Sequence, residues 1–207
     1  MKGDIYIISA PSGTGKSTII RKLIKIVPAL FFSISYTTRT PREREINGKD
    51  YFFVSLEEFE NLVANNEFLE YCKVHDNYYG THRDQVLPLI EKGLDVLLDI
   101  DVKGAMKIKG MFSDAILIFI LPPSLEELLR RLEKRHAESP EALKIRLNTL
   151  KEEVLYWKYY DYLLINDYLN KTIEDVKSII ISNRLRKDRQ AEIIEDIIHK
   201  KILSPLF

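Results

Sequence analysis

The segment that most constrains this chain is a short glycine-containing loop between an apolar run and an amphipathic stretch. The run at residues 4–9 reads DIYIIS and is rich in β-branched residues, as buried strands are. From Lys16 to Val27, apolar residues recur at helical spacing. Residues 10–17 between them read APSGTGKS, which matches the phosphate-loop pattern except that Ala10 replaces the first glycine. A strand, a tight loop and a helix in this order predict a site for phosphate groups.

The residue types in this loop suit the binding of phosphate. Gly13 and Gly15 allow backbone angles that a side chain would forbid, so consecutive N–H groups can point into one concavity. That concavity lies at the positive end of the helix dipole. Lys16 can reach the outer phosphates of a nucleotide, and the Ser17 hydroxyl can ligate Mg²⁺. The candidate nucleotide contacts are therefore Ala10, Pro11, Ser12, Gly13, Thr14, Gly15, Lys16, Ser17 and Thr18.

Later in the chain, short apolar runs alternate with helical patterns. The runs at residues 96–100, 115–121 and 162–165 are typical of strands that are covered on both faces. Strands that alternate with helices predict an α/β fold with a parallel sheet core flanked by helices. The helical patterns lie at residues 83–91, 124–135, 139–157 and 172–187.

Two regions interrupt this alternation. Residues 32–79 are rich in Tyr, Phe, Val and Thr, with a hairpin signal at Asn47-Gly48 and a helical pattern near residues 56–64. Residues 133–142 are strongly charged and resemble a helix–turn–helix. We therefore predict one domain with three parts: a core of residues 1–32, 82–123 and 158–207, a β-rich insertion of residues 33–81, and a helical lid region of residues 124–157.

Composition narrows the class of protein. The 207 residues are 45% hydrophobic, which is enough for a full core, and 31 basic residues balance 31 acidic ones. Zero net charge argues against non-specific nucleic-acid binding. The single cysteine cannot form an internal disulfide, and the longest apolar run is far shorter than the roughly 20 residues of a membrane span. We expect a cytoplasmic protein with no nucleic-acid or membrane partner, and the sequence leaves open whether it forms a homo-oligomer.

A second set of phosphate-binding residue types follows the loop. Residues 35–42 read SYTTRTPR, so Arg39 and Arg42 lie three residues apart beside several hydroxyl groups. Guanidinium groups bind phosphate in a bidentate manner and stay charged. Further on come FLEY at residues 68–71 and NYYGT at residues 77–81. Taken alone, each segment also has a plain structural interpretation: a solvated charged loop, the outer face of a strand, or tyrosines of a core.

Together these segments resemble the guanylate kinase family. The resemblance rests on SISYTTRTPRERE, NGKDYFFVS, NNEFLEY, NYYGT and LLDIDVKGA, with the phosphate loop and the later IND motif, and spans nearly the whole chain. It implies transfer of the γ-phosphoryl group of ATP to GMP, or to dGMP, with Mg²⁺ as the cofactor. It also implies a core domain, a GMP-binding insertion and a lid, in agreement with the two interruptions.

The resemblance assigns both ends of the acceptor nucleotide. It implies that the GMP phosphate contacts Arg39, Arg42, Tyr51 and Tyr79, and that guanine contacts Ser35, Glu70, Thr81 and Asp101. The chemistry agrees, because a carboxylate such as Glu70 can accept hydrogen bonds from both N1–H and the 2-amino group of guanine. Adenine presents a bare lone pair at N1, and sites that hydrogen-bond a substrate group reject analogues that lack it. A hydroxyl group of Ser35 or Thr81 can donate to guanine O6.

Two acidic residues end the apolar run VLLDID, at the edge of the sheet where ligands bind in open α/β folds. Of these, Asp99 is the candidate Mg²⁺ ligand through water, with Ser17 as the direct ligand. The plain alternative is that Asp99 caps the strand end. The resemblance also places Asn166 near the adenine of ATP.

Three arginines belong to the predicted lid. Arg131 and Arg135 lie four residues apart on one helical face, and Arg146 lies off the apolar stripe of the next helix. The resemblance implies that these arginines close over the ATP phosphates and are catalytic together with Lys16. The alternative is ion pairing on the helix surface, with Glu127, Glu138 or Glu141.

Other functions fit the sequence less well. A GTPase needs Asn-Lys-x-Asp to bind guanine, and residues 170–173 carry Ile in place of the Asp. A phosphate-loop kinase with another acceptor, such as a sugar phosphate, does not explain the guanine-binding set. A non-catalytic protein-binding relative of guanylate kinase tends to lose the loop lysine and the lid arginines, which this chain retains.

Two further clusters are interpreted structurally. The basic cluster RLRKDR at residues 184–189 is either a partner surface or a solvated face, and we favour the solvated face. The aromatic run YWKYYDY at residues 156–162 suggests either nucleobase stacking or core packing, and we favour the core.

Overall fold

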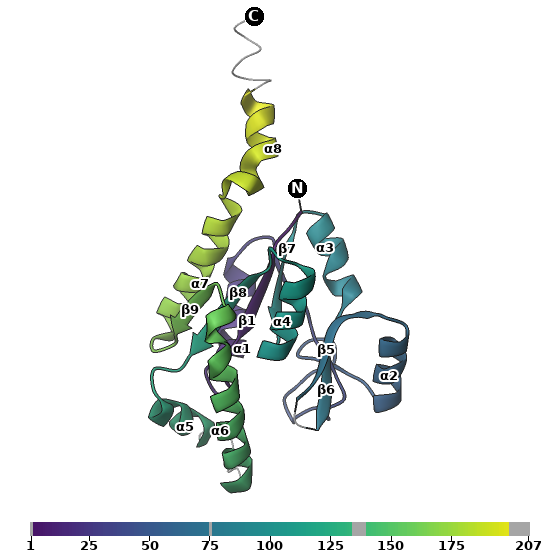
Figure 1. Ribbon diagram of the computed structural model, residues 1–207, viewed down its shortest axis with the longest axis vertical. Coiled ribbons are helices and arrows are strands. Elements are labelled where there is room, and N and C mark those ends of the chain that lie inside the picture. Colours follow the sequence, from purple (N-terminus) through teal and green to yellow (C-terminus); the bar gives the residue numbers. More distant parts are fainter. Residues whose placement is uncertain (1, 75, 134–139, 199–207) are drawn as a thin grey trace, which may run out of the picture.

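The computed structural model describes residues 2–74, 76–133 and 140–198, and a five-stranded parallel sheet forms its centre (Figure 1). The strand order is β2-β7-β1-β8-β9, and every neighbouring pair is parallel. This confirms the α/β fold with a parallel core. The strands are β1 (Ile5–Ser9), β2 (Leu30–Phe32), β7 (Asp95–Asp99), β8 (Ile116–Leu121) and β9 (Tyr162–Ile165).

Apolar side chains alternate between the two faces of this sheet. In β1, Tyr6 and Ile8 pack towards α1 (Lys16–Ile26) and α7 (Leu169–Arg184). Ile5 and Ile7 pack on the other face, towards α4 (Val102–Met111) and α3 (Leu87–Glu91). Both faces are covered, which explains why the central strands are continuous apolar runs. The strand β2 was not predicted, because three residues are too few to show a period.

A four-stranded sheet in the order β4-β3-β6-β5 lies beside the core. The hairpin expected at Asn47-Gly48 is wrong, because β3 and β4 pair in parallel. The long connection between β3 and β4 allows β4 to run in the same direction as β3. The other edge of β3 pairs with β6 in antiparallel orientation. The true hairpin joins β5 and β6. The elements are β3 (Tyr36–Thr37), β4 (Phe52–Phe53), α2 (Leu56–Ala64), β5 (Phe68–Val74) and β6 (Asn77–His82).

The remaining helices differ from the expected bounds. The pattern at residues 83–91 divides into a short 3₁₀ turn, η1 (Arg83–Gln85), and α3, because Pro88 is tolerated only in the first turn of a helix. In the predicted lid, α5 (Leu125–Glu133) is followed by α6 (Pro140–Val154) and the 3₁₀ turn η2 (Leu155–Tyr159). After α7 the chain forms a second helix, α8 (Lys187–Ile197), which extends away from the core (Figure 1).

The solvated interpretation of the basic cluster is wrong for Arg184 and Arg189. Arg184 Nε donates to Asp95 Oδ2 at 2.7 Å, and Arg189 lies 3.0 Å from an Asp4 carboxylate oxygen. Asp4 and Asp95 lie at the starts of the neighbouring parallel strands β1 and β7. This edge of the sheet therefore carries two negative charges. Burial raises the pKa of Asp4, while Arg189 opposes this shift. The two arginines therefore fasten the C-terminal helices to the core.

The aromatic run is also only partly in the core. Tyr160 is buried and its ring lies 4.9 Å from that of Phe119, as expected. Trp157 and Tyr159 are exposed, so the inward packing expected of them is wrong. Both residues belong to η2, which is a 3₁₀ turn. They therefore do not follow the α-helical spacing that would have directed them inward.

Candidate functional site

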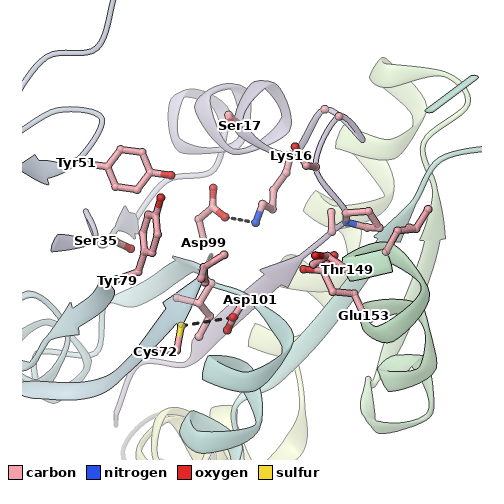
Figure 2. Close-up of a pocket in the computed structure, with 18 of the residues that line it drawn as sticks. Lys16, Ser17, Ser35, Tyr51, Cys72, Tyr79, Asp99, Asp101, Thr149 and Glu153 are labelled. Atoms are coloured by element: carbon pink, nitrogen blue, oxygen red, sulfur yellow. Dashed lines mark hydrogen bonds and ion pairs between the residues drawn. The ribbon is translucent and has the colours of Figure 1, made fainter. Parts of the chain in front are cut away.

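The predicted phosphate loop lies at the carboxyl end of β1 and leads directly into α1. Gly13 and Gly15 have φ values of 91° and 102°, so both take the left-handed conformation that favours glycine. Gly15 is also the N-cap residue of α1. The loop forms one wall of a cavity of about 310 Å³ at the carboxyl edge of the sheet (Figure 2). This is the edge at which ligands bind in open α/β folds.

Lys16 forms an ion pair with Asp99, which β7 places opposite the loop (Figure 2). Burial by itself would lower the pKa of Lys16, but the Asp99 carboxylate raises it above its usual value. The ammonium group is therefore held charged inside the cavity. Asp99 points to the lysine rather than capping its own strand, and Ser17 lines the same cavity.

Glu70 on β5 is the buried carboxyl group at the other end of the cavity, with 4% of its surface exposed. Its Oε1 accepts a hydrogen bond from Thr81 Oγ1 at 2.7 Å, and its Oε2 has no hydrogen-bond partner in the described part of the chain. Burial, with a smaller contribution from nearby Asp101, raises the pKa of Glu70 to about 7, although the Thr81 hydrogen bond opposes the shift. A Cβ atom on Gly104 would lie 2.8 Å from Oε2, so this carboxylate depends on a glycine in α4.

Asp101 lies beside Glu70 and lines the same cavity. Its Oδ1 accepts from the Gly104 N–H at 2.7 Å and caps α4, and its Oδ2 accepts from the Cys72 thiol at 3.4 Å. Ser35 lines the cavity, whereas the Thr81 hydroxyl is directed to Glu70. Of the two hydroxyl groups expected to reach guanine, only that of Ser35 faces the cavity.

The residues expected at the acceptor phosphate are close together, but they do not all face the cavity. Tyr51, Tyr79 and Arg42 line it, and the two tyrosine rings lie 6.0 Å apart. Burial raises the pKa of Tyr51 to about 12. Arg39 lies behind this wall, with its guanidinium 5.3 Å from the Tyr51 ring and its Nη2 donating to Glu45 at 2.9 Å.

Three residues expected at the ATP site meet behind the phosphate loop. The carbonyl oxygen of Thr14 accepts from Asn166 Nδ2 at 2.6 Å and from Arg131 Nη1 at 3.2 Å. Arg131 also donates to Glu127 at 2.7 Å. The structure therefore directs the Asn166 amide to the back of the loop. Thr18, in the first turn of α1, is exposed and does not line the cavity.

The other lid arginines are less fully placed. Arg135 lies outside the described residues, and Arg146 belongs to α6. Arg130 is half exposed and pairs with Glu127 at 2.6 Å. At the N-terminus of α5, the Glu127 N–H donates to Ser124 Oγ at 3.1 Å. The Glu127 carboxylate bonds the two arginines rather than returning to the cap.

Several residues that line the cavity were not predicted as site residues. Glu153 on α6 is the ionisable residue among them whose pKa is raised to about 7, mainly by burial, with Lys16 opposing the shift and Asp101 adding to it. The available signal was that Glu153 lies three residues after Leu150, an apolar residue of α6 that lines the same cavity. The missed lining residues are Cys72, Val74, Ile100, Leu128, Leu147, Thr149, Leu150 and Glu153.

Neither a membrane-spanning helix nor a metal-binding cluster of side chains is found in the described part of the chain. No helix in these parts of the chain has the length and apolar character needed to cross a bilayer. No group of three or more His, Cys, Asp or Glu side chains in residues 2–74, 76–133 and 140–198 could hold a metal ion.

Comparisons with known proteins agree on one family. A family model described as guanylate kinase matches residues 2–183. The guanylate kinase of Clostridium tetani is 44% identical over 205 residues, which cover 97% of this chain and 98% of that protein. That of Geobacter sulfurreducens is 44% identical over 196 residues, which cover 95% and 97%. The crystal structure of guanylate kinase from Anaplasma phagocytophilum superposes with a TM-score of 0.80 at 33% identity, covering 96% of this chain and 95% of that chain.

Proposed function

The chain belongs to the guanylate kinase family, and we propose that its cavity transfers the γ-phosphoryl group of ATP directly to GMP, giving ADP and GDP. One observation carries this proposal: the phosphate loop with Lys16 and the buried carboxyl group of Glu70 open into the same cavity. The first suits a nucleoside triphosphate and the second suits guanine. A nucleotide acceptor bound at Glu70 therefore shares one enclosed space with the donor.

The proposed reaction is an in-line displacement without a covalent enzyme intermediate. An oxygen of the GMP phosphate forms a bond to the γ-phosphorus while the bond from that phosphorus to the β,γ-bridging oxygen breaks. The electron pair leaves with ADP. The protein contributes chiefly position and charge stabilisation, which is the usual division of work in phosphoryl transfer.

Lys16 is the group proposed to stabilise charge on the transferring phosphoryl group. It is paired with Asp99 in the structure, so the incoming phosphates take the place of a carboxylate. Arg131, Arg135 and Arg146 are proposed to add positive charge from the lid once it closes. Closure also excludes water, which would otherwise hydrolyse ATP.

The acceptor is proposed to be held at both ends. Ser35, Glu70 and Asp101 contact guanine, with Thr81 orienting Glu70, whereas Arg42, Tyr51 and Tyr79 contact the phosphate. Arg39 reaches the phosphate by leaving Glu45, with which it is paired in the structure. The three-part division proposed for the chain assigns these residues mainly to an insertion at 33–81 that moves towards the core.

Mg²⁺ is the proposed cofactor. Ser17 and Asp99 line the cavity beside Lys16, so a hydroxyl and a carboxylate are available where the triphosphate would lie. Two such groups fit an ion that is held mainly by phosphates and water. Ser17 would bind it directly and Asp99 through water, and Mg²⁺ supplies neutralisation of the triphosphate charge. A cytoplasmic location, where ATP and GMP meet, is part of the proposal.

An assay of ADP release with ATP and each of GMP, AMP, CMP and UMP tests this function. We expect turnover with GMP and only background ADP release with the other three acceptors or with none. Equal rates with all four nucleotides would contradict the guanine site. ADP release only with a sugar phosphate would favour another kinase, and no release with any acceptor would favour a protein-binding module.

A further inference from the structure

The main chain crosses between the two sheets at two places. β2 belongs to the parallel sheet and β3 to the four-stranded sheet, so residues 33–35 between them form the outgoing crossing. β6 ends in the four-stranded sheet, and residues 83–86 form the return crossing. Val86, the last residue of this crossing, is fully buried in the core. Any movement of the four-stranded sheet relative to the core must therefore bend the chain at these crossings.

One side chain joins the two crossings. Gln85 on the return crossing accepts a hydrogen bond at Oε1 from the Ile34 N–H at 2.8 Å, and its Nε2 donates to the Ile34 carbonyl oxygen at 2.8 Å. We call these two hydrogen bonds the Gln85 clasp. Because peptide groups are planar, the clasp holds the two peptide planes on either side of the Ile34 Cα atom. It therefore fixes both backbone dihedral angles of Ile34.

The residues on either side of Ile34 are held by different sheets. The Ser33 N–H donates to the Leu97 carbonyl oxygen of β7 at 3.1 Å. The Ser35 carbonyl oxygen accepts from the Phe52 N–H of β4 at 2.9 Å. Ile34 is thus the residue at which the chain passes from one sheet to the other. A change in its dihedral angles would turn one sheet relative to the other and would break at least one bond of the clasp.

Ser35 connects the clasp to the ligand cavity. It is 7% exposed and lines the cavity on the side of Tyr51 and Tyr79 (Figure 2). Its N–H belongs to the peptide plane that Gln85 holds through the Ile34 carbonyl group. Gln85 itself is not among the residues that line the cavity. The orientation of Ser35 therefore depends on a side chain outside the cavity.

We propose that Gln85 is a positioning residue for the acceptor base: its amide holds the backbone at Ile34 and so presents the Ser35 hydroxyl group to guanine. The inference rests on the proposed function, because it takes the acceptor to be GMP. A misplaced hydroxyl group weakens its contact in the bound state and in the transition state alike. Such a loss of uniform binding raises the KM for GMP and leaves kcat unchanged.

The test measures kcat and the KM values for GMP and ATP in the full-length protein and in four variants: Gln85→Met, Ser35→Ala, the double variant and Gln190→Met. Methionine matches glutamine in size but has no amide. Gln190 is the matched control, because its Nε2 also donates to a backbone carbonyl group, that of Arg184, and it does not line the cavity. We expect Gln85→Met to raise the KM for GMP about three- to tenfold, with kcat and the KM for ATP unchanged. Gln190→Met should leave both KM values unchanged.

The double variant separates positioning of Ser35 from general support of the fold. Once Ser35→Ala has removed the hydroxyl group, Gln85→Met should raise the KM for GMP little further, because the two residues act as one unit. An equal fold-change with and without the Ser35 hydroxyl group would overturn the proposal. A folded Gln85→Met variant with the parental KM for GMP would overturn it as well.

Melting temperatures show whether each variant is folded. If Gln85→Met does not fold, Gln85→Glu carries the same comparison, because its carboxylate keeps the size but cannot donate to the Ile34 carbonyl group. We expect Gln85→Glu to raise the KM for GMP only in the presence of the Ser35 hydroxyl group, and an unchanged KM would overturn the proposal. Absence of GMP phosphorylation in the unaltered protein would instead overturn the proposed function, and this inference with it.

Discussion

The Thr81 hydroxyl donates to Glu70 at 2.7 Å and so holds one carboxylate oxygen, while the other oxygen has no hydrogen-bond partner among the described residues. Thr81 is therefore a positioning group, and the second oxygen of Glu70 is the one left to meet a ligand. Because both residues are buried, the arrangement is set before any nucleotide binds. This relationship underlies the first two predictions.

Glu70→Gln should weaken GMP binding and leave ATP binding unchanged. The amide replaces one acceptor oxygen with a donor, which faces the donor edge of guanine. Each lost charge-assisted hydrogen bond costs about 1.5–3 kcal/mol, so the KM for GMP should rise at least about tenfold. Steady-state kinetics with both substrates varied would show it. An unchanged KM for GMP would remove Glu70 from the base site.

The same variant should stabilise the ligand-free protein at alkaline pH. The pKa of Glu70 is raised to about 7 in the folded state, so its contribution to stability is full below the unfolded value near 4.5 and is lost as the pH rises through 7. At pH 8, Glu70→Gln should therefore increase the free energy of unfolding, by at most about 3 kcal/mol. Urea titrations at pH 5 and pH 8 compare the two conditions. An equal change in the free energy of unfolding at both pH values would argue against a charged carboxylate that is destabilised by burial.

Lys16→Ala should reduce kcat by about 10²–10³-fold, on the scale of one lost electrostatic contact in a transition state. The variant also leaves Asp99 without its ion-pair partner. Lys25→Ala, an exposed lysine on the same helix, is the control and should retain full activity. Near-normal turnover by Lys16→Ala would contradict the phosphate-loop assignment.

The two sets of arginines should affect different kinetic constants. Arg39→Ala should raise the KM for GMP more than that for ATP, because Arg39 lies behind the tyrosines of the acceptor end. Arg135→Ala should mainly lower kcat, by about 10³-fold, as arginine fingers do. Kinetics with both substrates varied would separate the cases. A GMP-specific KM defect in Arg135→Ala, with kcat intact, would refute its lid role.

Arg189→Met should destabilise the fold without changing KM for either substrate. It leaves Asp4 and the nearly fully buried Asp95 with fewer cationic partners, and breaking such a buried pair costs about 3–5 kcal/mol. Arg186→Ala is the matched control, because Arg186 and Asp188 form an exposed pair worth roughly 0–1 kcal/mol. Thermal unfolding of both variants would compare them. Equal melting temperatures would place Arg189 among the solvated residues after all.

The parts of the fold that were predictable have a local cause. The phosphate loop and the strands β1, β7 and β8 show in their own residues, because a strand covered on both faces must be apolar throughout. The run that forms β9 was also predicted as a strand, but three of its four residues are exposed, so the expected coverage on both faces is wrong for it. The parallel pairing of β3 with β4 was not predictable from Asn47-Gly48, since that signal describes a turn and the pairing depends on β6, far along the chain. The exposure of Trp157 likewise depends on a change from α to 3₁₀ geometry that residue types do not reveal.

The cavity also contains both residues that the sequence predicts and residues that it does not. Lys16, Asp99 and Glu70 were predictable because each belongs to a motif whose residue types the chemistry requires. Glu153 belongs to no motif, and its place in the cavity depends on how α6 packs across the carboxyl edge of the sheet. Asn166 was expected near the adenine of ATP, and in the structure its amide donates to the loop carbonyl of Thr14, a contact that the sequence does not reveal.

The position of β1 in the middle of the sheet has a consequence for the nascent chain on the ribosome. β1 is the first strand to be made, yet both of its neighbours come much later, and Asp4 contacts Asp95 across 91 residues of chain. Its outer support is later still, because Asn183 reaches Asp4 across 179 residues. Long-range pairing of this kind is slow to form. The apolar strand β1 therefore stays without its partner strands for much of synthesis. We expect the nascent chain to depend most on chaperones before α7 has left the ribosome.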